Sequence, residues 1–171
     1  MKWLFRSIGL TLLVFTTICV IGAFIPAKQS VEVSTVLDSD VLNVYEIISD
    51  LRSYPEWSGV GGPNSEWVFG GADIETGQTA GWQAGEKFGS LEILQTEPGQ
   101  FVGVNVIGPL GEQTLSLALG EAETGTSFLI RAERDLGGFP YLSRIASLRQ
   151  KSDTKKALQQ ATDGLSEMVE P

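Results

Sequence analysis

The chain has 171 residues, 42% of them hydrophobic, and a formal net charge of -9. Its length leaves room for one globular domain of roughly 140 residues beside a short terminal segment. An acidic balance disfavours nucleic-acid binding, because phosphate recognition needs a basic surface. Histidine is absent, which excludes Ser-His-Asp and Cys-His catalysis and the common zinc ligand sets. Cys19 is the only cysteine, so the rest of the chain has no thiol nucleophile or disulfide.

The N-terminal segment is short and basic, and a run without charge follows from Ser7 to Ile25. This run is close to the ~20 residues needed to cross a bilayer core and longer than the apolar core of a typical signal peptide. Residues 1–27 are therefore predicted to be a retained transmembrane helix with residues 7–25 in the bilayer, and residues 28–171 a separate domain. The alternative is cleavage after Ala27 and secretion.

Orientation follows from the flanking charges. Lys2, Arg6 and the amino terminus outnumber Lys28 on the far side of the run. The positive-inside rule then leaves the N-terminus in the cytoplasm. We expect the domain outside the cytoplasmic membrane, on the periplasmic side if the source is bacterial.

The domain opens with an alternating segment, Val31 to Leu37, which predicts a strand. Asp38-Ser39-Asp40 follows as a turn and helix cap, and Val41 to Ser49 is predicted to be a short helix. Pro55 is expected to impose extended or turn geometry on Tyr54 and to end helical structure there. A Gly-rich loop follows.

The middle of the chain is a series of short alternating segments separated by turn residues. They predict antiparallel strands at Glu66 to Phe69, Gln78 to Gln83, Gly89 to Thr96, Phe101 to Ile107, Glu112 to Leu119 and Thr126 to Leu136. The last segment, Ser143 to Glu170, has helical periodicity. Its apolar stripe comprises Tyr141, Ile145, Leu148, Leu158, Ala161, Leu165 and Met168. A helix with one apolar stripe needs the apolar face of a sheet, and any gap between the two is a pocket.

The segment Ile47 to Trp57 reads Ile-Ile-Ser-Asp-Leu-Arg-Ser-Tyr-Pro-Glu-Trp. It is similar to the aspartate, aromatic-proline and tryptophan pattern of the START-like or SRPBCC superfamily, in particular its polyketide cyclase/dehydrase and lipid-transport branch. The hairpin at residues 85–98 and the segment Ala157 to Val169, with Gly164-Leu165, also resemble that family. The resemblance covers roughly residues 30 to 170, the size of one domain.

The resemblance implies an α+β helix-grip fold. In that fold a curved antiparallel sheet, here of about six or seven strands, wraps a long C-terminal helix around an internal cavity. Members of the family bind lipids, sterols, quinones, hormones or polyketides, and many have no known reaction. We predict no cofactor and no metal site.

Six large aromatic residues could line such a cavity: Trp57, Trp67, Trp82, Phe88, Phe101 and Phe128. Core packing is the favoured interpretation for each, because aromatic side chains dominate core burial. Trp57 lies beside the Gly-rich loop at the expected mouth of the cavity, so packing and ligand contact weigh equally there. Trp57, Trp82, Phe88 and Phe101 are kept as candidate ligand-binding residues.

Arg131 and Glu133 share one face of the last predicted strand. Inside a cavity they would have to be paired or used, because an unpaired buried charge is costly. The in-out alternation with Phe128, Ile130 and Ala132 instead favours a place in solvent. Both orientations stay open, and the two residues remain candidates.

Other polar candidates are weaker. Asn105 and Tyr141 could orient a bound polar group, and Leu165 could contact a ligand from the helix. Arg134 and Asp135 are expected at the surface. Asp50 is expected to cap or pair locally, and Gly164 to allow a close approach of the helix to the sheet.

Three functions remain open. The leading hypothesis is membrane-tethered binding of a hydrophobic small molecule, a lipid or isoprenoid for example, in the internal cavity. The second is an enzyme of the cyclase, dehydratase or hydrolase kind, which without histidine would need a cavity carboxylate with a raised pKa. The third is an interaction module with a filled cavity and an unknown protein partner.

Overall fold

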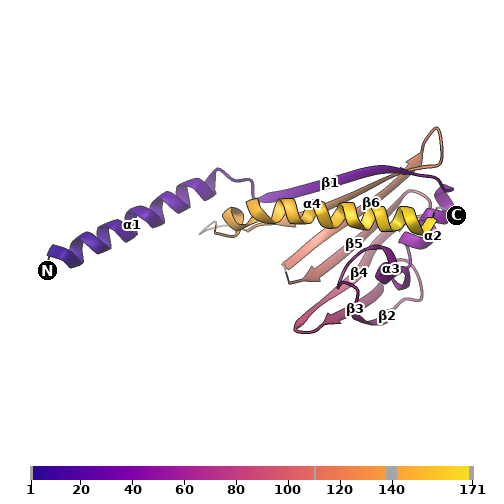
Figure 1. Cartoon of the computed structure of the whole chain (residues 1–171), viewed down its shortest axis with the longest axis horizontal. Helices are drawn as coiled ribbons and strands as arrows, with labels where there is room; N and C mark the ends of the chain where they lie inside the picture. Colours follow the sequence, from indigo (N-terminus) through magenta and orange to yellow (C-terminus); the bar gives the residue numbers. More distant parts are fainter. Residues whose placement is uncertain (1, 110, 138–141, 170–171) are drawn as a thin grey trace.

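The computed structural model describes residues 2–109, 111–137 and 142–169 as an α+β structure (Figure 1). The elements follow in this order: α1 (Lys2–Ala23), β1 (Lys28–Leu37), α2 (Val41–Ile48), the 3₁₀ turn η1 (Leu51–Ser53), α3 (Tyr54–Trp57), β2 (Glu66–Gly71), β3 (Gln78–Ala84), β4 (Lys87–Glu97), β5 (Phe101–Gly108), β6 (Gly111–Glu121), β7 (Thr126–Asp135) and α4 (Leu142–Val169).

The strands form one seven-stranded antiparallel sheet in the order β1-β7-β6-β5-β4-β3-β2. Strands β2 to β7 are neighbours in sequence and in the sheet, whereas β1 crosses to pair with β7 along its whole length. The helix α4 lies over one face of this sheet and contacts β1, β7 and α3 (Figure 1). A seven-stranded antiparallel sheet with a long C-terminal helix across it fits a helix-grip fold.

Strand alternation decides which side chains face α4. On β7 the side chains of Phe128, Ile130 and Ala132 are buried. From the helix, Leu158 and Leu165 pack into the same core cluster. Because apolar burial is the dominant favourable term in folding, this contact between the helix stripe and the inner face of the sheet holds the two layers together.

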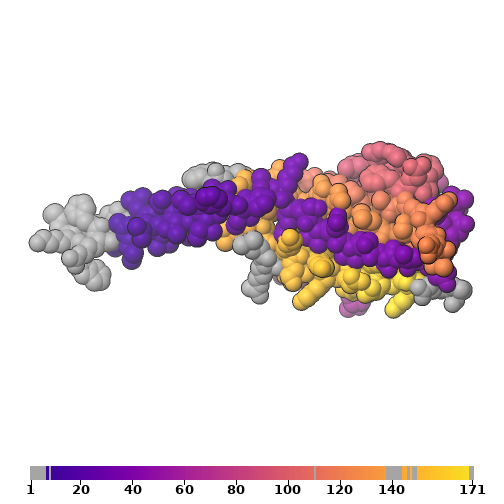
Figure 2. All heavy atoms as spheres, turned by 90° about the horizontal axis from the view of Figure 1, so that it is seen from above, coloured from indigo at the N-terminus to yellow at the C-terminus, as the bar shows by residue number. Residues whose placement is uncertain are grey.

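The helix α1 projects away from the sheet along the long axis of the molecule, and its contacts with the remaining elements are mainly with α4 (Figures 1 and 2). Its apolar side chains are largely exposed: Leu10, Leu12, Leu13, Val14, Phe15, Val20 and Ile21. In the part of the chain that the structure describes, no helix is long and apolar enough to cross a membrane. The transmembrane helix predicted for residues 7–25 is therefore not found.

The strands and helices predicted from periodicity all occur, with ends within three residues of the expected positions. The prediction for Pro55 is wrong. Tyr54 has φ -57° and ψ -34° and begins α3, with Pro55 in the first turn of that helix. A proline is tolerated there because the first turn needs no backbone N–H donor from it.

One position of the predicted apolar stripe on α4 is also wrong. Met168 is 39% exposed, whereas Val169 is buried. The reason is helical geometry, since the residue four positions after Leu165 returns to the same face. The stripe position Tyr141 lies outside the described residues, and nothing is described of the Leu148 side chain.

Candidate functional site

A small cavity of about 150 Å³ lies between α4 and the inner face of the sheet. Its wall is mainly apolar and comes from α3 and the loop that follows it, and from β6, β7 and α4. The lining residues are Tyr54, Trp57, Ser58, Val60, Gln113, Leu115, Ile130, Asp153, Thr154, Ala157, Leu158 and Ala161. This is the space that the sequence predicted between the C-terminal helix and the sheet.

Trp57 forms one wall of the cavity from the short helix α3. Its indole Nε1 donates to Ser53 Oγ at 3.1 Å. The Ser53 hydroxyl in turn donates to the carbonyl oxygen of Ile47 at 2.6 Å. The Tyr54 ring packs beside the indole, with ring centroids 4.7 Å apart and planes tilted by 58°. Because the one polar atom of the indole is bonded within its own helical turn, the ring presents carbon to the cavity.

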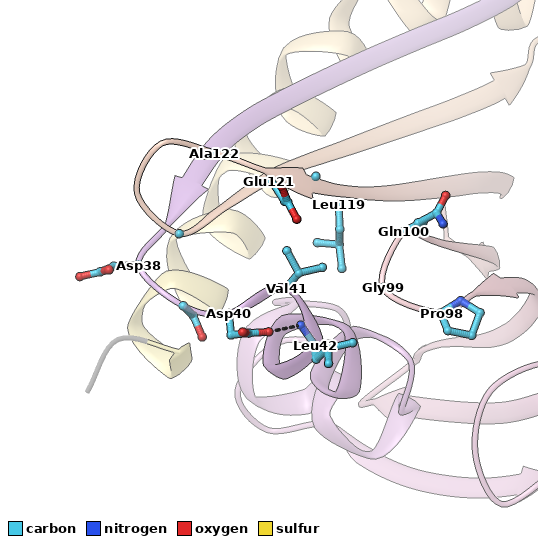
Figure 3. Close-up of a pocket in the computed structure, with 13 residues that line it drawn as sticks. Asp38, Asp40, Val41, Leu42, Pro98, Gly99, Gln100, Leu119, Glu121 and Ala122 are labelled. Carbon is cyan, nitrogen blue, oxygen red and sulfur yellow. Dashed lines mark hydrogen bonds between the residues drawn. The ribbon is translucent and has the colours of Figure 1, made fainter.

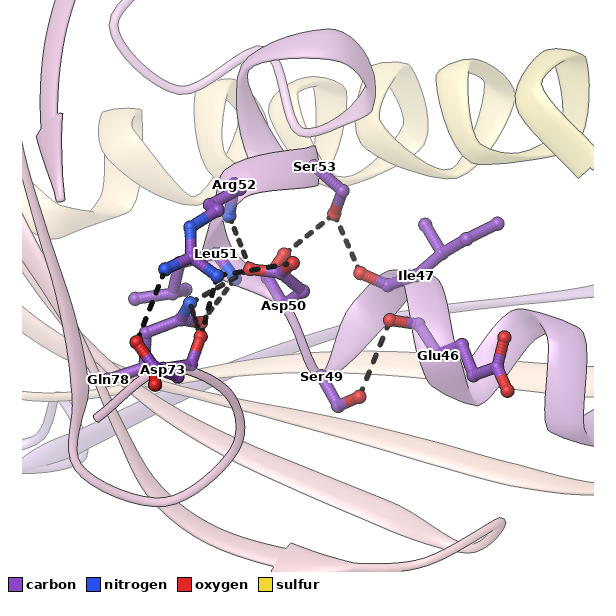
Figure 4. A network of polar contacts seen from close by, with 9 residues as sticks. All are labelled: Glu46, Ile47, Ser49, Asp50, Leu51, Arg52, Ser53, Asp73 and Gln78. Atoms are coloured by element: carbon purple, nitrogen blue, oxygen red, sulfur yellow. Dashed lines mark hydrogen bonds and ion pairs between the residues drawn. The ribbon is translucent and has the colours of Figure 1, made fainter.

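The turn that carries Trp57 is fixed to the sheet by a buried glutamine (Figure 4). Gln78, on β3, accepts from the backbone N–H of Leu51 at 2.6 Å and donates to Asp50 Oδ1 at 2.8 Å. Asp50 also accepts from the backbone N–H of Arg52 at 2.9 Å and so caps η1, as predicted. The side chain of Arg52 donates to the carbonyl oxygen of Asp73 at 2.7 Å, which ties the β2–β3 loop to the same turn.

Gly164 lets α4 approach this turn closely. A Cβ atom at Gly164 would lie 2.7 Å from the carbonyl oxygen of Trp57 and 3.2 Å from its Cα. Real Cβ contacts are essentially never that short, so only glycine permits the observed distance between the two helices. The close approach expected from Gly164 therefore exists, but its partner is the backbone of α3 and not the sheet.

A polar cluster around Arg134 adjoins the cavity through Gln113, which is the member of the cluster that lines it. Arg134 Nη2 donates to Gln113 Oε1 at 3.1 Å, and Arg134 Nη1 donates to Gln150 Oε1, on α4, at 3.0 Å. The surface position expected for Arg134 is therefore wrong, because an arginine bonded to α4 lies on the inner face. Desolvation by burial lowers the pKa of its guanidinium. Arg134 Nε is buried and has no hydrogen-bond partner among the described residues.

Tyr54 contributes a buried hydroxyl near the cavity. It donates to the carbonyl oxygen of Ile48 at 3.0 Å, and burial raises the pKa of its phenol. A phenol held in this way stays protonated and serves as a structural donor. The carboxylate of Asp153 also lines the cavity, from an exposed position on α4.

Of the candidates chosen from sequence, Trp57 lines the cavity. Leu165 and Trp82 are buried in the core, and no described residue accepts a hydrogen bond from Trp82 Nε1. Phe101 is half-buried on β5, and Phe88 is 75% exposed on β4.

The polar candidates do not meet at the cavity. Arg131 lies on the outer face and donates twice to Glu32 Oε2, at 3.1 and 2.9 Å. Glu133 is exposed on the same face, and Asn105 donates to Glu112 Oε1 at 3.0 Å. Tyr141 lies outside the described residues.

Sequence reasoning missed Tyr54, Gln113 and Arg134 as site residues. A signal for Arg134 was present, since it continues the even-numbered positions of Phe128, Ile130 and Ala132 on one strand face. Gln113 could not be recognised, because it lies two positions before Leu115 at the polar start of β6, where the alternation is weakest.

A second and larger depression of about 940 Å³ lies where β1 ends and α2 begins (Figure 3). It is wide open to solvent, and its acidic residues are Asp38, Asp40 and Glu121. Asp40 is already used as the cap of α2, where it accepts from the backbone N–H of Leu42 at 2.7 Å. Within the described residues, no group of three or more acidic or cysteine side chains could hold a metal ion. The smaller and more apolar cavity under α4 is therefore the better candidate site.

Comparison with known proteins shows similar folds but assigns no function. No family model and no curated protein matches the chain. Among solved structures, a Chromobacterium violaceum protein matches with a TM-score of 0.60 and 16% identity, over 84% of this chain and 99% of that one. A Bacillus halodurans protein matches with a TM-score of 0.62 and 15% identity, over 83% and 97%. DynU16, a protein of the dynemicin biosynthetic locus, matches with a TM-score of 0.54 and 20% identity, over 81% of this chain and 46% of its own length.

Proposed function

We propose that this chain is a START-like, SRPBCC-type module that binds a small apolar molecule in the cavity between α4 and the sheet. The observation that carries the proposal is the cavity itself, which has a mainly apolar lining and an aromatic wall at Trp57. Apolar concave sites with a few polar groups are the usual form of small-molecule sites. The resemblance of the segment Ile47 to Trp57 to that superfamily supports the same assignment.

The size of the cavity limits the ligand. At about 150 Å³ it is smaller than the roughly 300–1,000 Å³ of typical ligand pockets. An apolar cavity of roughly this volume is known to accept benzene. We therefore propose a ligand whose buried part is a single ring or a short alkyl chain. A larger lipid would require α3 or α4 to move.

Membrane attachment is the second part of the proposal. The exposed apolar side chains of α1 project away from the domain, and water is an unfavourable environment for so much contiguous apolar surface. We propose that a lipid bilayer covers them and keeps the domain close to a source of apolar ligands.

Ligand binding is tested by filling the cavity. Full-length protein in lipid nanodiscs is titrated with benzene, toluene and short alkanols, and binding is measured by ligand-observed NMR against empty nanodiscs. Ala161 lines the cavity and is buried, so Ala161→Leu should lower the affinity at least about tenfold while the protein stays folded. The matched control is Gln159→Leu, on the exposed side of the same helix.

If the wild-type protein binds no member of the panel, small-molecule binding is refuted and the interaction module becomes the better hypothesis. Equal affinity of Ala161→Leu and the wild-type protein would show that the ligand binds outside this cavity.

Membrane attachment is tested separately by liposome flotation. The full chain should float with the liposomes, and Leu13→Ser together with Phe15→Ser should weaken flotation, because both side chains are exposed apolar groups of α1. Thr16→Ser and Thr17→Ser, which change hydroxyl residues of the same helix, are the control. Recovery of the wild-type chain in the unbound fraction would contradict the proposal.

A further inference from the structure

We propose that the ligand of this cavity carries a carboxylate and that Arg134 binds it. This inference rests on the ligand-binding function proposed above and names its chemical class: a short amphiphilic acid, with a ring or alkyl chain as its body and one carboxylate as its head. Three observations carry it, namely the charge around Arg134, the geometry of its donors, and its connection to the cavity.

The charge around Arg134 is unusual for this chain. Acidic residues outnumber basic ones by 21 to 12, and the arginines Arg52 and Arg131 each have a carboxylate partner. Among the described residues, no carboxylate lies within 4.0 Å of Arg134. Its neighbours Glu133 and Asp135 are exposed. The fold therefore partly buries a cation without placing a carboxylate of the described residues beside it, and a bound anion would offset the cost of that partial burial.

The cluster around Arg134 is made of neutral amides. Gln113 and Gln150 each offer an oxygen to one Nη atom. Gln29 pairs with Arg134 across the β1–β7 ladder and donates to the carbonyl oxygen of Ser147, on α4, at 3.1 Å. Amide side chains hold a guanidinium in place without neutralising it, and they exchange readily for a stronger acceptor.

The donor geometry suits a carboxylate. In the described part of the chain the buried Nε–H of Arg134 has no partner, and beside it Nη2 donates to an amide oxygen. These two nitrogens form one edge of the planar guanidinium, which matches the two oxygens of a carboxylate. A phosphate monoester would bring close to two charges and three oxygens to a single guanidinium. A carboxylate is therefore the better fit.

Gln113 connects this cluster to the cavity. It lines the cavity and accepts from Arg134 Nη2. A ligand that enters with its apolar body against Trp57 and Leu115 would meet Gln113 before Arg134. Its carboxylate would then take the place of the Gln113 oxygen on the guanidinium. Asp153 also lines the cavity, so repulsion would orient the acid away from that residue.

The test compares butanoate and hexanoate with the alcohols of the same chain length, on full-length protein in nanodiscs, by ligand-observed NMR. The wild-type protein should bind each acid at least about tenfold more tightly than its alcohol, after subtraction of empty nanodiscs. Arg134→Gln should remove this preference and leave alcohol binding unchanged, and Arg134→Lys should restore part of it. Arg131→Gln, which removes an arginine from the outer face of the same strand, should leave it intact.

Gln113→Glu is a second test variant that keeps Arg134 in place, so its result holds even if substitutions of Arg134 prevent folding. It places a carboxylate of the protein on Arg134, and it should abolish the preference for acids. If neither acids nor alcohols bind the wild-type protein, the proposed function itself fails. If both bind with equal affinity, the proposed function stands and the role of Arg134 is refuted.

Discussion

At the scale of single residues, Gly164 has the clearest consequence for the cavity. It stands inside α4, near the C-terminal end of that helix, and glycine in a helix interior costs up to about 1 kcal/mol relative to alanine. The backbone of Trp57 lies where a Cβ atom at Gly164 would be. A residue with lower helix propensity at this position therefore allows α4 to lie in close contact with the backbone of α3 at Trp57, a residue that lines the cavity.

Gly164→Ala should lower the stability of the protein, although alanine is the better helix former. The added methyl group would have to push α4 away from the Trp57 backbone, and such overpacking costs about 1–3 kcal/mol. We expect a net loss of about 1–2 kcal/mol in the free energy of unfolding, measured by chemical denaturation. Glu167→Ala, at an exposed position on the same helix, is the control and should be nearly neutral. A more stable Gly164→Ala protein would show that the close contact has no energetic weight.

Arg134 shows the limit of sequence reasoning at this scale. Alternation places it on the inner face of β7 with Phe128, Ile130 and Ala132, yet its charge and its position near the strand end predict the surface. The structure resolves the conflict through Gln150 and Gln113, whose oxygens satisfy the guanidinium. These partners come from distant parts of the chain, so no local pattern could have revealed them.

At the scale of secondary-structure elements, the turn from η1 to α3 is held from one side by a single side chain. Gln78 is almost completely buried on β3 and bonds to Leu51, to Asp50 and, at 3.0 Å, to the carbonyl oxygen of Asp73. Its amide thereby joins the sheet, the turn and the β2–β3 loop (Figure 4). A buried amide with several partners specifies one position for the segments that it connects.

Gln78→Ala should therefore be strongly destabilising. It leaves the backbone N–H of Leu51 without its acceptor and opens a small void beneath the turn. We expect a loss of about 2–4 kcal/mol in the free energy of unfolding, and weaker ligand binding because Trp57 is no longer fixed. Gln83→Ala is the matched control on the same strand, where the glutamine is exposed and bonds only to the carbonyl oxygen of Gly85. Equal stability of the two variants would refute the role of Gln78.

The elements themselves were predictable from the sequence. Apolar residues recur about every 2 residues in a half-buried strand and about every 3.6 residues in a helix, and both patterns are local properties of the chain. The strands from Gln78 to Asp135 occur where alternation places them, and α4 occurs where the apolar stripe does. The turn at Tyr54 was not predictable from Pro55 alone. Whether a proline ends a helix or begins one depends on the residues that follow, and here the turn is stabilised by contacts with β3.

At the scale of the whole molecule, the order of the sheet explains why the cavity lies between α4 and the strands β6 and β7. The first strand β1 pairs with the last strand β7, so α4, which follows β7, crosses back over the inner face toward α3 (Figure 1). The sequence predicted this layering from one apolar stripe and one apolar sheet face. It could not predict the cavity volume, which depends on how closely Gly164 brings α4 to Trp57.

The helix α1 and the sheet domain meet through few contacts of the described residues. The link between them is held by two backbone carbonyls, since the N–H of Leu136 donates to Ala27 at 2.8 Å and Arg144 Nη1 donates to Ile25 at 3.2 Å. The apolar core lies entirely on the domain side of this link. Folding of the domain should therefore depend on residues 25–27 but not on the helix before them.

Removal of residues 1–24 should consequently leave the domain almost as stable as in the full chain. A chain that begins at Ile25 keeps both carbonyl acceptors, so we expect a change below about 1 kcal/mol, or a Tm shift of at most roughly 2–4 °C, by calorimetry in the same detergent. A chain that begins at Lys28 lacks both acceptors and should melt at a lower temperature, because the hydrogen bonds from the Leu136 N–H to Ala27 and from Arg144 Nη1 to Ile25 are lost. A large loss of stability in the longer of the two chains would mean that α1 is part of the folding unit, and it would exclude a helix that serves only to attach the domain to a bilayer.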